Sequence, residues 1–495
     1  PGTDAFAERE AMIEAMIDAV RCPTLVVHGT DDRMVPAHWG EELAARMKAD
    51  LVLLEGSGHV PLGRDPVRCN HLIRDFVDHV HPPAPRQHTW PRAQSRRKRA
   101  LFVSSPIGLG HALRDVAIAR SLREQCPGLE IEWLAQHPVT DVLEARGEHI
   151  HPASRFLASE SRHVESESGE HDLHVFQALR RMDEILVANF HVFDDVVTEE
   201  QFDLWIGDEA WDVDYFLHEN PERKRAAYCW LTDFVGFVPM PEGGERELAL
   251  TADYNAEMIE QVERFGRIRD RALFVGNPDD IVPLSFGPDL PGIREWTERR
   301  FDFSGYITGF DASAVADRDT LRTEFGYRPD EQVCIVTVGG SGVGTSLLRK
   351  VLGAYDETRE RVPDLRMVAI AGPRIDPAVL DAPAGVDVHA FVPDLYRLLA
   401  ACDVAVVQGG LTTTMELTAN RRPFLYFPLA EHFEQQFHVP HRLDRYRAGR
   451  RMDYRASDRA TIAAGIADAL TTPLDYAPVE TDGAERAAAL IAEML

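Results

Sequence analysis

The chain has 495 residues, of which 44% are hydrophobic, and its formal net charge is −28. This length is typical of about three compact units with real cores. The strongly acidic balance argues against a nucleic-acid-binding protein.

The cysteines and the apolar segments bear on the location of the protein. The six cysteines lie far apart, without CxxC or zinc-site spacing, so we expect free thiols in a reducing compartment. The sequence has no run of eighteen apolar residues and does not open on a signal peptide, and we therefore expect a cytoplasmic protein. Because the chain begins at Pro1 rather than Met, an upstream portion is expected to be missing.

Residues 1–82 are predicted to form an incomplete α/β unit. Buried strands are expected over 22–29 and 51–54, and the loops that follow them carry Asp32 and His59. This order resembles the last quarter of an α/β-hydrolase, in which the acid and the histidine of a triad follow successive strands. No G-x-S-x-G nucleophile motif occurs in the sequence, so we interpret the pair as vestigial. The alternative is a serine hydrolase or esterase activity if the missing part is supplied.

Residues 83–99 are predicted to be a linker between domains. The segment is rich in proline at its start and has no hydrophobic periodicity, which is typical of an extended connector. Its second half is basic, and clustered basic side chains attract acidic lipids, so a peripheral membrane contact is the alternative. The basic residues are Arg92, Arg96, Arg97, Lys98 and Arg99.

Residues 100–312 are predicted to form a doubly wound domain with a parallel sheet, because strands alternate with helices along the chain. Later strands are expected over 226–232, 273–275 and 306–308. The segment 153–170 is rich in Ser, Glu and His and is expected to be a mobile surface loop.

Two loops of this domain carry side chains suited to proton transfer. The strand over 100–104 leads into a tight turn flanked by Gly108 and Gly110, and His111 stands at the start of the next helix. Asp208 directly follows another predicted strand. A histidine suits acid–base work because its pKa lies near neutral pH.

Residues 313–495 are predicted to form a second doubly wound domain. A buried strand in its centre ends in Gln408, Gly409 and Gly410, where the missing side chains let a ligand approach the backbone. The next helix begins near Thr412, and its free N–H groups and positive dipole end suit a phosphate.

Further polar residues continue this series along the chain. Glu416 lies one turn into the same helix, where its carboxylate can accept hydrogen bonds from ribose hydroxyls. A second strand, over 423–428, leads to Glu434, Gln435 and Gln436, whose side chains can bind sugar hydroxyls. Phosphate, ribose and sugar would thus be bound in chain order.

These features resemble the donor-binding segment of the GT-B nucleotide-sugar glycosyltransferases, in the group of the peptidoglycan N-acetylglucosaminyltransferase and the macrolide and flavonoid UDP-glycosyltransferases. The matching residues are Gly409, Gly410, Glu416, Pro423, Pro428, Gln435 and Gln436. Gln408 departs from the pattern, since many members have histidine there; an amide can still donate to a phosphate but carries no charge. The resemblance covers about residues 100–495 and implies two facing Rossmann-like domains: 100–312 for the acceptor and 313–495 for the donor.

The resemblance also implies roles for other residues of the donor domain. The glycine-rich loop after the strand over 333–338 resembles the family's G-G-S loop, whose backbone N–H groups and serine hydroxyl hold the donor diphosphate. Backbone atoms near Phe391 and Val392 are expected to read the edge of a uracil or thymine. The residues expected to hold the diphosphate are Gly340, Ser341, Gly342 and Arg374.

In the acceptor domain, the resemblance implies that Gly108 and Gly110 belong to the acceptor loop, that His111 is the general base, and that Asp208 orients it. Glu209 or Asp212 is the alternative for the acid, and a structural role is the alternative for His111. Asp212 and Asp214 spell D-x-D, a metal-holding signature of another glycosyltransferase fold. They fall in a helical stretch whose i and i+2 positions point apart, so we interpret them as a solvated helix face.

The implied reaction is the inverting transfer of a hexosyl group from a nucleoside diphosphate sugar to a hydroxyl of a small-molecule or lipid acceptor. UDP is the favoured nucleotide, and no metal or other cofactor is expected. A nucleotide-sugar 2-epimerase on the same fold is the alternative reaction.

Overall fold

The computed structural model describes residues 3–84, 96–310, 315, 317–340 and 342–495, and Ser341 therefore lies outside the described residues. The chain divides into two compact units, Pro1–Pro91 and Arg92–Leu495.

The first unit is a small α/β fragment. Its sheet consists of the two predicted strands, which pair in parallel, and among the described residues neither strand has a second partner. Large apolar side chains remain exposed on this unit, including Met34 and Trp39, as expected for part of a larger hydrolase sheet. Its elements are α1 (Thr3–Ala19), β1 (Leu25–Gly29), α2 (Ala37–Met47), β2 (Asp50–Leu54), α3 (Pro61–Arg64) and α4 (Pro66–Val80).

The second unit begins with a lobe built on a parallel sheet in the order β5-β4-β3-β6-β7-β8-β9, which we call the first lobe. Its strands are β3 (Arg99–Ser104), β4 (Glu130–Leu134), β5 (His149–Ile150), β6 (Leu204–Asp208), β7 (Ala227–Thr232), β8 (Arg271–Phe274) and β9 (Asp302–Phe303). Its helices are α5 (Leu109–Gln125), α6 (Val139–Ala145), α7 (Glu160–Ser166), α8 (Val175–Arg180), α9 (Asp183–Glu199), α10 (Trp211–Glu219), α11 (Gly244–Arg264) and α12 (Ile293–Arg300).

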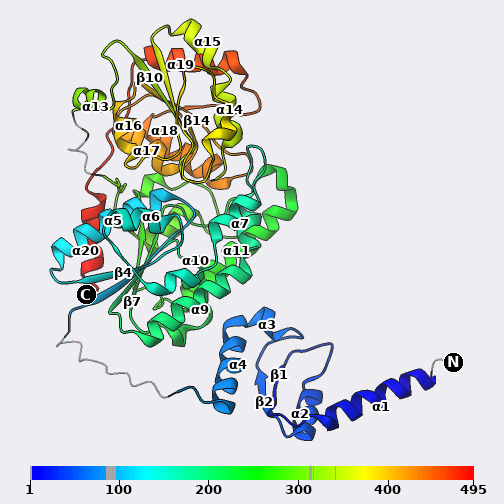
Figure 1. Ribbon diagram of the computed structural model, residues 1–495. Helices are drawn as coiled ribbons and strands as arrows, with labels where there is room; N and C mark the ends of the chain where they lie inside the picture. Colours follow the sequence, from blue (N-terminus) through cyan, green and yellow to red (C-terminus); the bar gives the residue numbers. More distant parts are fainter. Residues whose placement is uncertain (1–2, 85–95, 311–314, 316, 341) are drawn as a thin grey trace. The chain divides into compact units, whose positions relative to one another are not determined.

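The second lobe has a parallel sheet in the order β12-β11-β10-β13-β14-β15. Its strands are β10 (Gln332–Thr337), β11 (Leu365–Ile370), β12 (Asp387–His389), β13 (Val404–Gln408), β14 (Phe424–Phe427) and β15 (Arg450–Arg451). Its helices are α13 (Arg318–Glu324), α14 (Thr345–Leu352), α15 (Tyr355–Arg361), α16 (Leu395–Ala401), α17 (Leu411–Ala419), α18 (Val439–Tyr446) and α19 (Arg459–Thr471). The last helix, α20 (Gly483–Ala492), returns to the first lobe and packs in its core beside α5 (Figure 1).

The central strands of both sheets are almost completely buried. In β13, the residues from Val404 to Val407 are completely buried, and the sheet carries a separate apolar core on each face. Parallel strands covered on both sides read as continuous apolar runs, because neither face meets water. Helices accordingly flank both faces of each sheet (Figure 1).

The strand order brings the loops that carry the predicted site residues together at the carboxyl ends of the strands in each sheet. In the first lobe, successive strands are added outward on one side from β3 and on the other side from β6. In the second lobe, the same change of side occurs between β10 and β13. Ligands of doubly wound sheets bind beyond the carboxyl ends of the strands at such switch points. The lobes meet there: a Cβ added to Gly110 would overlap the Thr412 side chain, so glycine permits this approach.

Three predictions about the first lobe are wrong. Residues 306–308 form a buried coil rather than a strand, since the last strand of the sheet is β9. Asp212 and Asp214 are buried rather than solvated, because Arg269 reaches in to pair with Asp214. The expected mobile loop over 153–170 contains α7, which packs through Val164 against the second lobe.

At the end of the predicted linker, Arg96 and Arg99 contact the first lobe. Residues 85–95 lie outside the described residues. Arg96 pairs with Asp203, and the guanidinium of Arg99 pairs with Glu132 and Glu200, so these two charges are already compensated within the first lobe. In the part of the chain that the structure describes, no helix has the length and apolar character needed to cross a membrane.

Candidate active site

His111 stands in the first turn of α5 and is held from behind by Asp208. The helix begins after Gly108, whose extended backbone ends the loop from β3, and β6 lies directly beside β3. Asp208, the last residue of β6, thereby comes within 3.0 Å of His111, measured from Asp208 Oδ2 to His111 Nδ1. Because Nδ1 faces this carboxylate, Nε2 is the nitrogen left to exchange a proton with a ligand.

Arg114, one turn further along α5, links this pair to a second carboxylate, that of Asp233. Its Nε donates to Asp208 Oδ2 at 2.9 Å, and its other nitrogens pair with Asp208 and Asp233. The positions of His111 and Arg114 differ by three, so both side chains lie on one face of the helix. Asp233 follows β7, the next strand of the sheet.

This network determines the protonation of Asp208 and Glu209, the two acids next to His111. Burial alone would raise the pKa of Asp208, but the charges of Arg114 and His111 hold it well below its usual range. Burial and the neighbouring Asp233 carboxylate raise the pKa of Glu209 to about 7. Asp208 is therefore a fixed negative charge, whereas Glu209 titrates near neutral pH.

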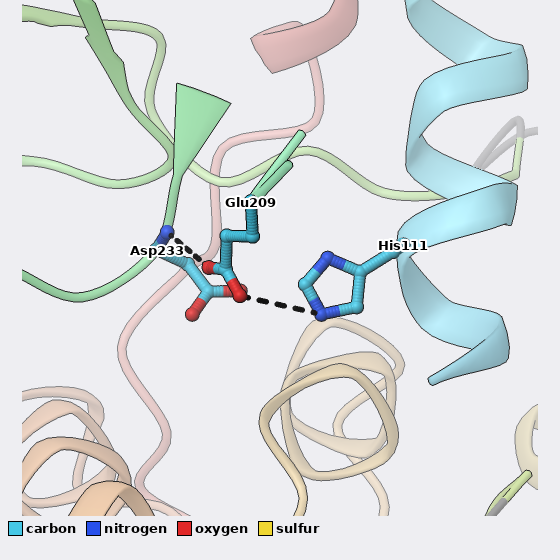
Figure 2. Close-up of side chains that lie close together, drawn as sticks. All are labelled: His111, Glu209 and Asp233. Atoms are coloured by element: carbon cyan, nitrogen blue, oxygen red, sulfur yellow. Dashed lines mark hydrogen bonds and ion pairs between the residues drawn. The ribbon is translucent and has the colours of Figure 1, made fainter. Parts of the chain in front are cut away.

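The pKa of His111 follows from the same surroundings. Burial and the Arg114 charge favour the neutral imidazole, but the carboxylates of Asp208 and Glu209 outweigh them and raise the pKa of His111 to about 9. Glu209 Oε2 lies 3.9 Å from Nε2 (Figure 2). Without a ligand, His111 is thus mostly protonated at neutral pH.

His111, Glu209 and Asp233 are residue types that can bind a metal ion. Their potential ligand atoms lie within 4.8 Å of one another (Figure 2). Arg114 already pairs with Asp233, and Glu209 Oε1 accepts hydrogen bonds from Thr232 Oγ1 and the Asp233 N–H. The trio is therefore charge-compensated by its own protein neighbours. The expectation that catalysis needs no metal stays a prediction.

Residues of both lobes line a cavity of about 170 Å³ that contains His111. Of the predicted site residues, those in its wall are Gly108, Gly110, His111, Gly340, Arg374, Gln408, Gly410, Thr412, Glu434 and Gln435. Gln408 is buried, and its Oε1 has no hydrogen-bond partner within the described residues. An amide in this state is available to a ligand.

A second cavity, of about 280 Å³, adjoins the first, and Gly110, Gly340 and Thr412 line both. Its lining is mainly apolar, and Asp141, Asp394 and Glu416 are among the wall residues. The predicted residues in its wall are Gly110, Gly340, Phe391, Val392, Thr412 and Glu416. Burial raises the pKa of Glu416 to about 8.

Several predicted residues lie outside both cavities. Asp208 is buried behind His111, and Gly409 faces Pro428 at the end of β14. The side chain of Gln436 donates to the Leu429 carbonyl oxygen at 2.6 Å and accepts from Arg451, so its amide is already used. Gly342 lies beside the first cavity, where its N–H donates to the carboxylate of Glu165.

Sequence reasoning did not find four residues of this site: Arg114, Asp233, Glu165 and Leu109. Asp233 follows a parallel strand, and Arg114 lies one turn after His111, so both carry a signal that could have been used. Leu109 contacts Gly340 across the lobes, and no local pattern marks it. Glu165 falls in the segment expected to be a loop.

The vestigial hydrolase pair is also assembled in the first unit. His59 Nδ1 lies 2.9 Å from Asp32 Oδ2, and Asp32 Oδ1 accepts from the N–H groups of Met34 and Val35. Ser57, the serine nearest in sequence, is completely buried. It is therefore not placed as an accessible nucleophile.

Comparisons with known proteins follow this division of the chain. Residues 3–72 match the alpha/beta hydrolase family, and residues 333–495 match the glycosyltransferase family 28 C-terminal domain. A crystal structure of the glycotransferase of kitacinnamycin superimposes with a TM-score of 0.51 at 19% identity, covering 81% of this chain and 95% of that one. Residues 92–495 have a GT-B glycosyltransferase fold. The predicted fold class and the predicted resemblance are both confirmed.

Curated glycosyltransferases match shorter stretches of the chain. An uncharacterized glycosyltransferase of Methanopyrus kandleri is 26% identical over 183 residues, which are 36% of this chain and 50% of that protein. The UDP-N-acetylglucosamine--N-acetylmuramyl-(pentapeptide) pyrophosphoryl-undecaprenol N-acetylglucosamine transferase of Mycolicibacterium vanbaalenii is 35% identical over 129 residues, or 25% and 30% of the two chains. The chain thus spans half or less of the length of these relatives.

Proposed function

We propose that this GT-B protein transfers a hexosyl group from a nucleoside diphosphate sugar, with UDP favoured, to a hydroxyl of a small-molecule or lipid acceptor, with inversion at the anomeric carbon. One observation carries the proposal: His111 from the first lobe and Gly410 and Glu434 from the second line the same cavity. In this proposal, the base and the helix start that binds the phosphate belong to the wall of one cavity, which holds the sugar.

In this reaction His111 Nε2 takes the acceptor hydroxyl proton as the acceptor oxygen bonds to the anomeric carbon. The bond from that carbon to the diphosphate oxygen breaks on the opposite face, which inverts the configuration. Asp208 stabilises the imidazolium that forms. The backbone N–H groups after β10 and at the start of α17 stabilise the leaving diphosphate, since preorganised donors suit a developing negative charge.

The nucleoside would occupy the 280 Å³ cavity, with Glu416 binding the ribose hydroxyls. Above about pH 8, where Glu416 is ionised, Glu416→Ala is expected to weaken binding of UDP by roughly 10- to 100-fold, because hydrogen bonds to a carboxylate contribute about 1.5–3 kcal/mol. Isothermal titration calorimetry measures the change. Glu360→Ala, an exposed site on α15 outside both cavities, is the matched control. Equal affinity in both variants would remove the ribose role of Glu416.

The raised pKa of His111 predicts an alkaline pH profile for the transfer. The base must be neutral, and it is mostly protonated below about pH 9, so kcat/KM should fall about tenfold per pH unit from about pH 9 to pH 7; below pH 7 Glu209 loses its charge and the fall becomes less steep. The charges of Asp208 and Glu209 raise the pKa of His111, and that of Arg114 lowers it. Glu209→Gln removes one of the charges that raise this pKa, so the acid limb of the pH–rate profile should move to lower pH.

Rates measured from pH 6 to pH 10 test this profile. Glu222→Gln, which removes one exposed carboxylate from the same lobe, is the control and should leave the limb in place. A limb that does not move in Glu209→Gln would contradict the assignment of the titrating group to His111.

Product analysis tests the function as a whole. Saturation-transfer NMR with UDP- and dTDP-hexoses identifies the donor, which is then incubated with hydroxylated aromatic and lipid acceptors. The expected product has the anomeric configuration opposite to that of the donor, as read from the coupling constant of its anomeric proton. Isomerised nucleotide sugar formed without any acceptor would support the 2-epimerase instead.

A further inference from the structure

Glu165 of the first lobe reaches into the glycine-rich loop of the second. Its Oε1 accepts a hydrogen bond from the Gly342 N–H at 3.2 Å and pairs with the guanidinium of Arg374. A Cβ added to Gly342 would lie 2.6 Å from the carboxyl carbon of Glu165. The carboxylate therefore occupies the space that the missing side chain leaves beside the backbone.

These two donors are the kind that an incoming diphosphate needs. The N–H of Gly342 belongs to the loop between β10 and α14, and Arg374 follows β11, the neighbouring strand. A carboxylate and a phosphate both present anionic oxygens to such groups. The Arg374 side chain is 11% exposed in the pair and that of Glu165 is 29% exposed, so water screens their attraction only partly.

The backbone that carries Glu165 is fixed on the first lobe. Ser161 Oγ donates to the Pro106 carbonyl oxygen at 2.6 Å. The side chain of Glu160, next to it, accepts from the amides of Gln136 and Asn189, each at 2.9 Å. Because α7 is held in this way, Glu165 is presented to the loop at a defined position.

The same segment is also attached to the second lobe beyond Glu165. The Leu173 N–H donates to the Ala430 carbonyl oxygen at 3.1 Å. Val164 and Leu173 pack with Val343 and Leu429 in one apolar cluster. Rotation of the Glu165 side chain alone would vacate the loop, since these other contacts do not involve its carboxylate.

We propose that Glu165 is an intramolecular occupant of the diphosphate subsite, which the nucleotide-sugar donor must displace from Gly342 and Arg374. This inference rests on the proposed function, because it takes this loop to be the diphosphate site. An internal competitor lowers apparent affinity by the fraction of molecules in which the subsite is open. Its return after transfer would also favour release of the nucleoside diphosphate.

Calorimetry with UDP and dTDP on the full chain tests the proposal. Glu165→Gln and Glu165→Ala are expected to bind the nucleotides about 3- to 10-fold more tightly than the parent. Glu167→Gln removes a charge from the end of the same helix, where the residue pairs with Arg181, and should bind like the parent. The gain should vanish in an Arg374→Gln background, because the competition acts through that side chain.

Each other outcome overturns a distinct statement. Unchanged or weaker binding in both Glu165 variants, with normal binding by the parent, would refute the competition and leave the donor site standing. A gain of the same size in Glu167→Gln would show that the tighter binding follows from the loss of any negative charge in this region, and would refute specific competition by Glu165. If neither nucleotide bound to the parent or to any variant, the proposed function itself would fail.

Discussion

His111→Ala is expected to lower kcat for glycosyl transfer by about 10²- to 10⁴-fold, the usual contribution of a positioned acid–base group. His111 is the cavity-lining imidazole whose Nδ1 contacts Asp208, and Asp208 is completely buried. Without it, the acceptor hydroxyl has no base with this orientation. The effect should fall on turnover, because the 280 Å³ cavity proposed for the nucleoside does not include His111.

Steady-state kinetics and calorimetry together measure this prediction. The affinity for UDP should stay within about twofold of the parent, since a residue that acts only in the transition state lowers kcat without changing donor binding. His137→Ala, at an exposed histidine of the first lobe, is the control and should keep full activity. Turnover of His111→Ala within a few-fold of the parent would refute the base assignment.

Arg114→Met is expected to destabilise the GT-B unit by about 3–5 kcal/mol, the typical cost of leaving buried charges unpaired. Arg114 is 5% exposed and holds both Asp208 and Asp233, which are themselves buried. Methionine fills similar space but supplies no charge or donor. The melting temperature should fall by several degrees, and activity should fall because Asp208 keeps only His111 of its two charged partners.

Two further variants separate this explanation from simple loss of packing. Arg120→Met changes an exposed arginine on the same helix and should leave the melting temperature nearly unchanged. Asp233→Asn combined with Arg114→Met should lose less stability than the sum of the single changes, because one unpaired charge is removed. Additive losses would show that the charges do not interact through Arg114.

The sequence by itself determined the architecture and the loops that we propose to carry the chemistry. Continuous apolar runs such as 404–407 must be buried on both faces, and glycines at strand ends mark backbone approached by a ligand or by the other lobe. Because the strand order puts those ends together, His111 and Asp208 meet although 97 residues separate them. The hydrolase fragment followed in the same way from two strands and two loops.

Only the tertiary structure decided how the charged groups interact. Arg114 and Asp233 enter the site from a helix face and a strand end that no motif links, and Glu165 crosses from one lobe to the other. Asp212 and Asp214 prove to be buried, and Gln436 turns its amide to the backbone. The physical reason is the distance along the chain over which each effect acts. Strand and turn preferences depend on neighbours in sequence, whereas desolvation and charge pairing depend on residues that only folding brings together.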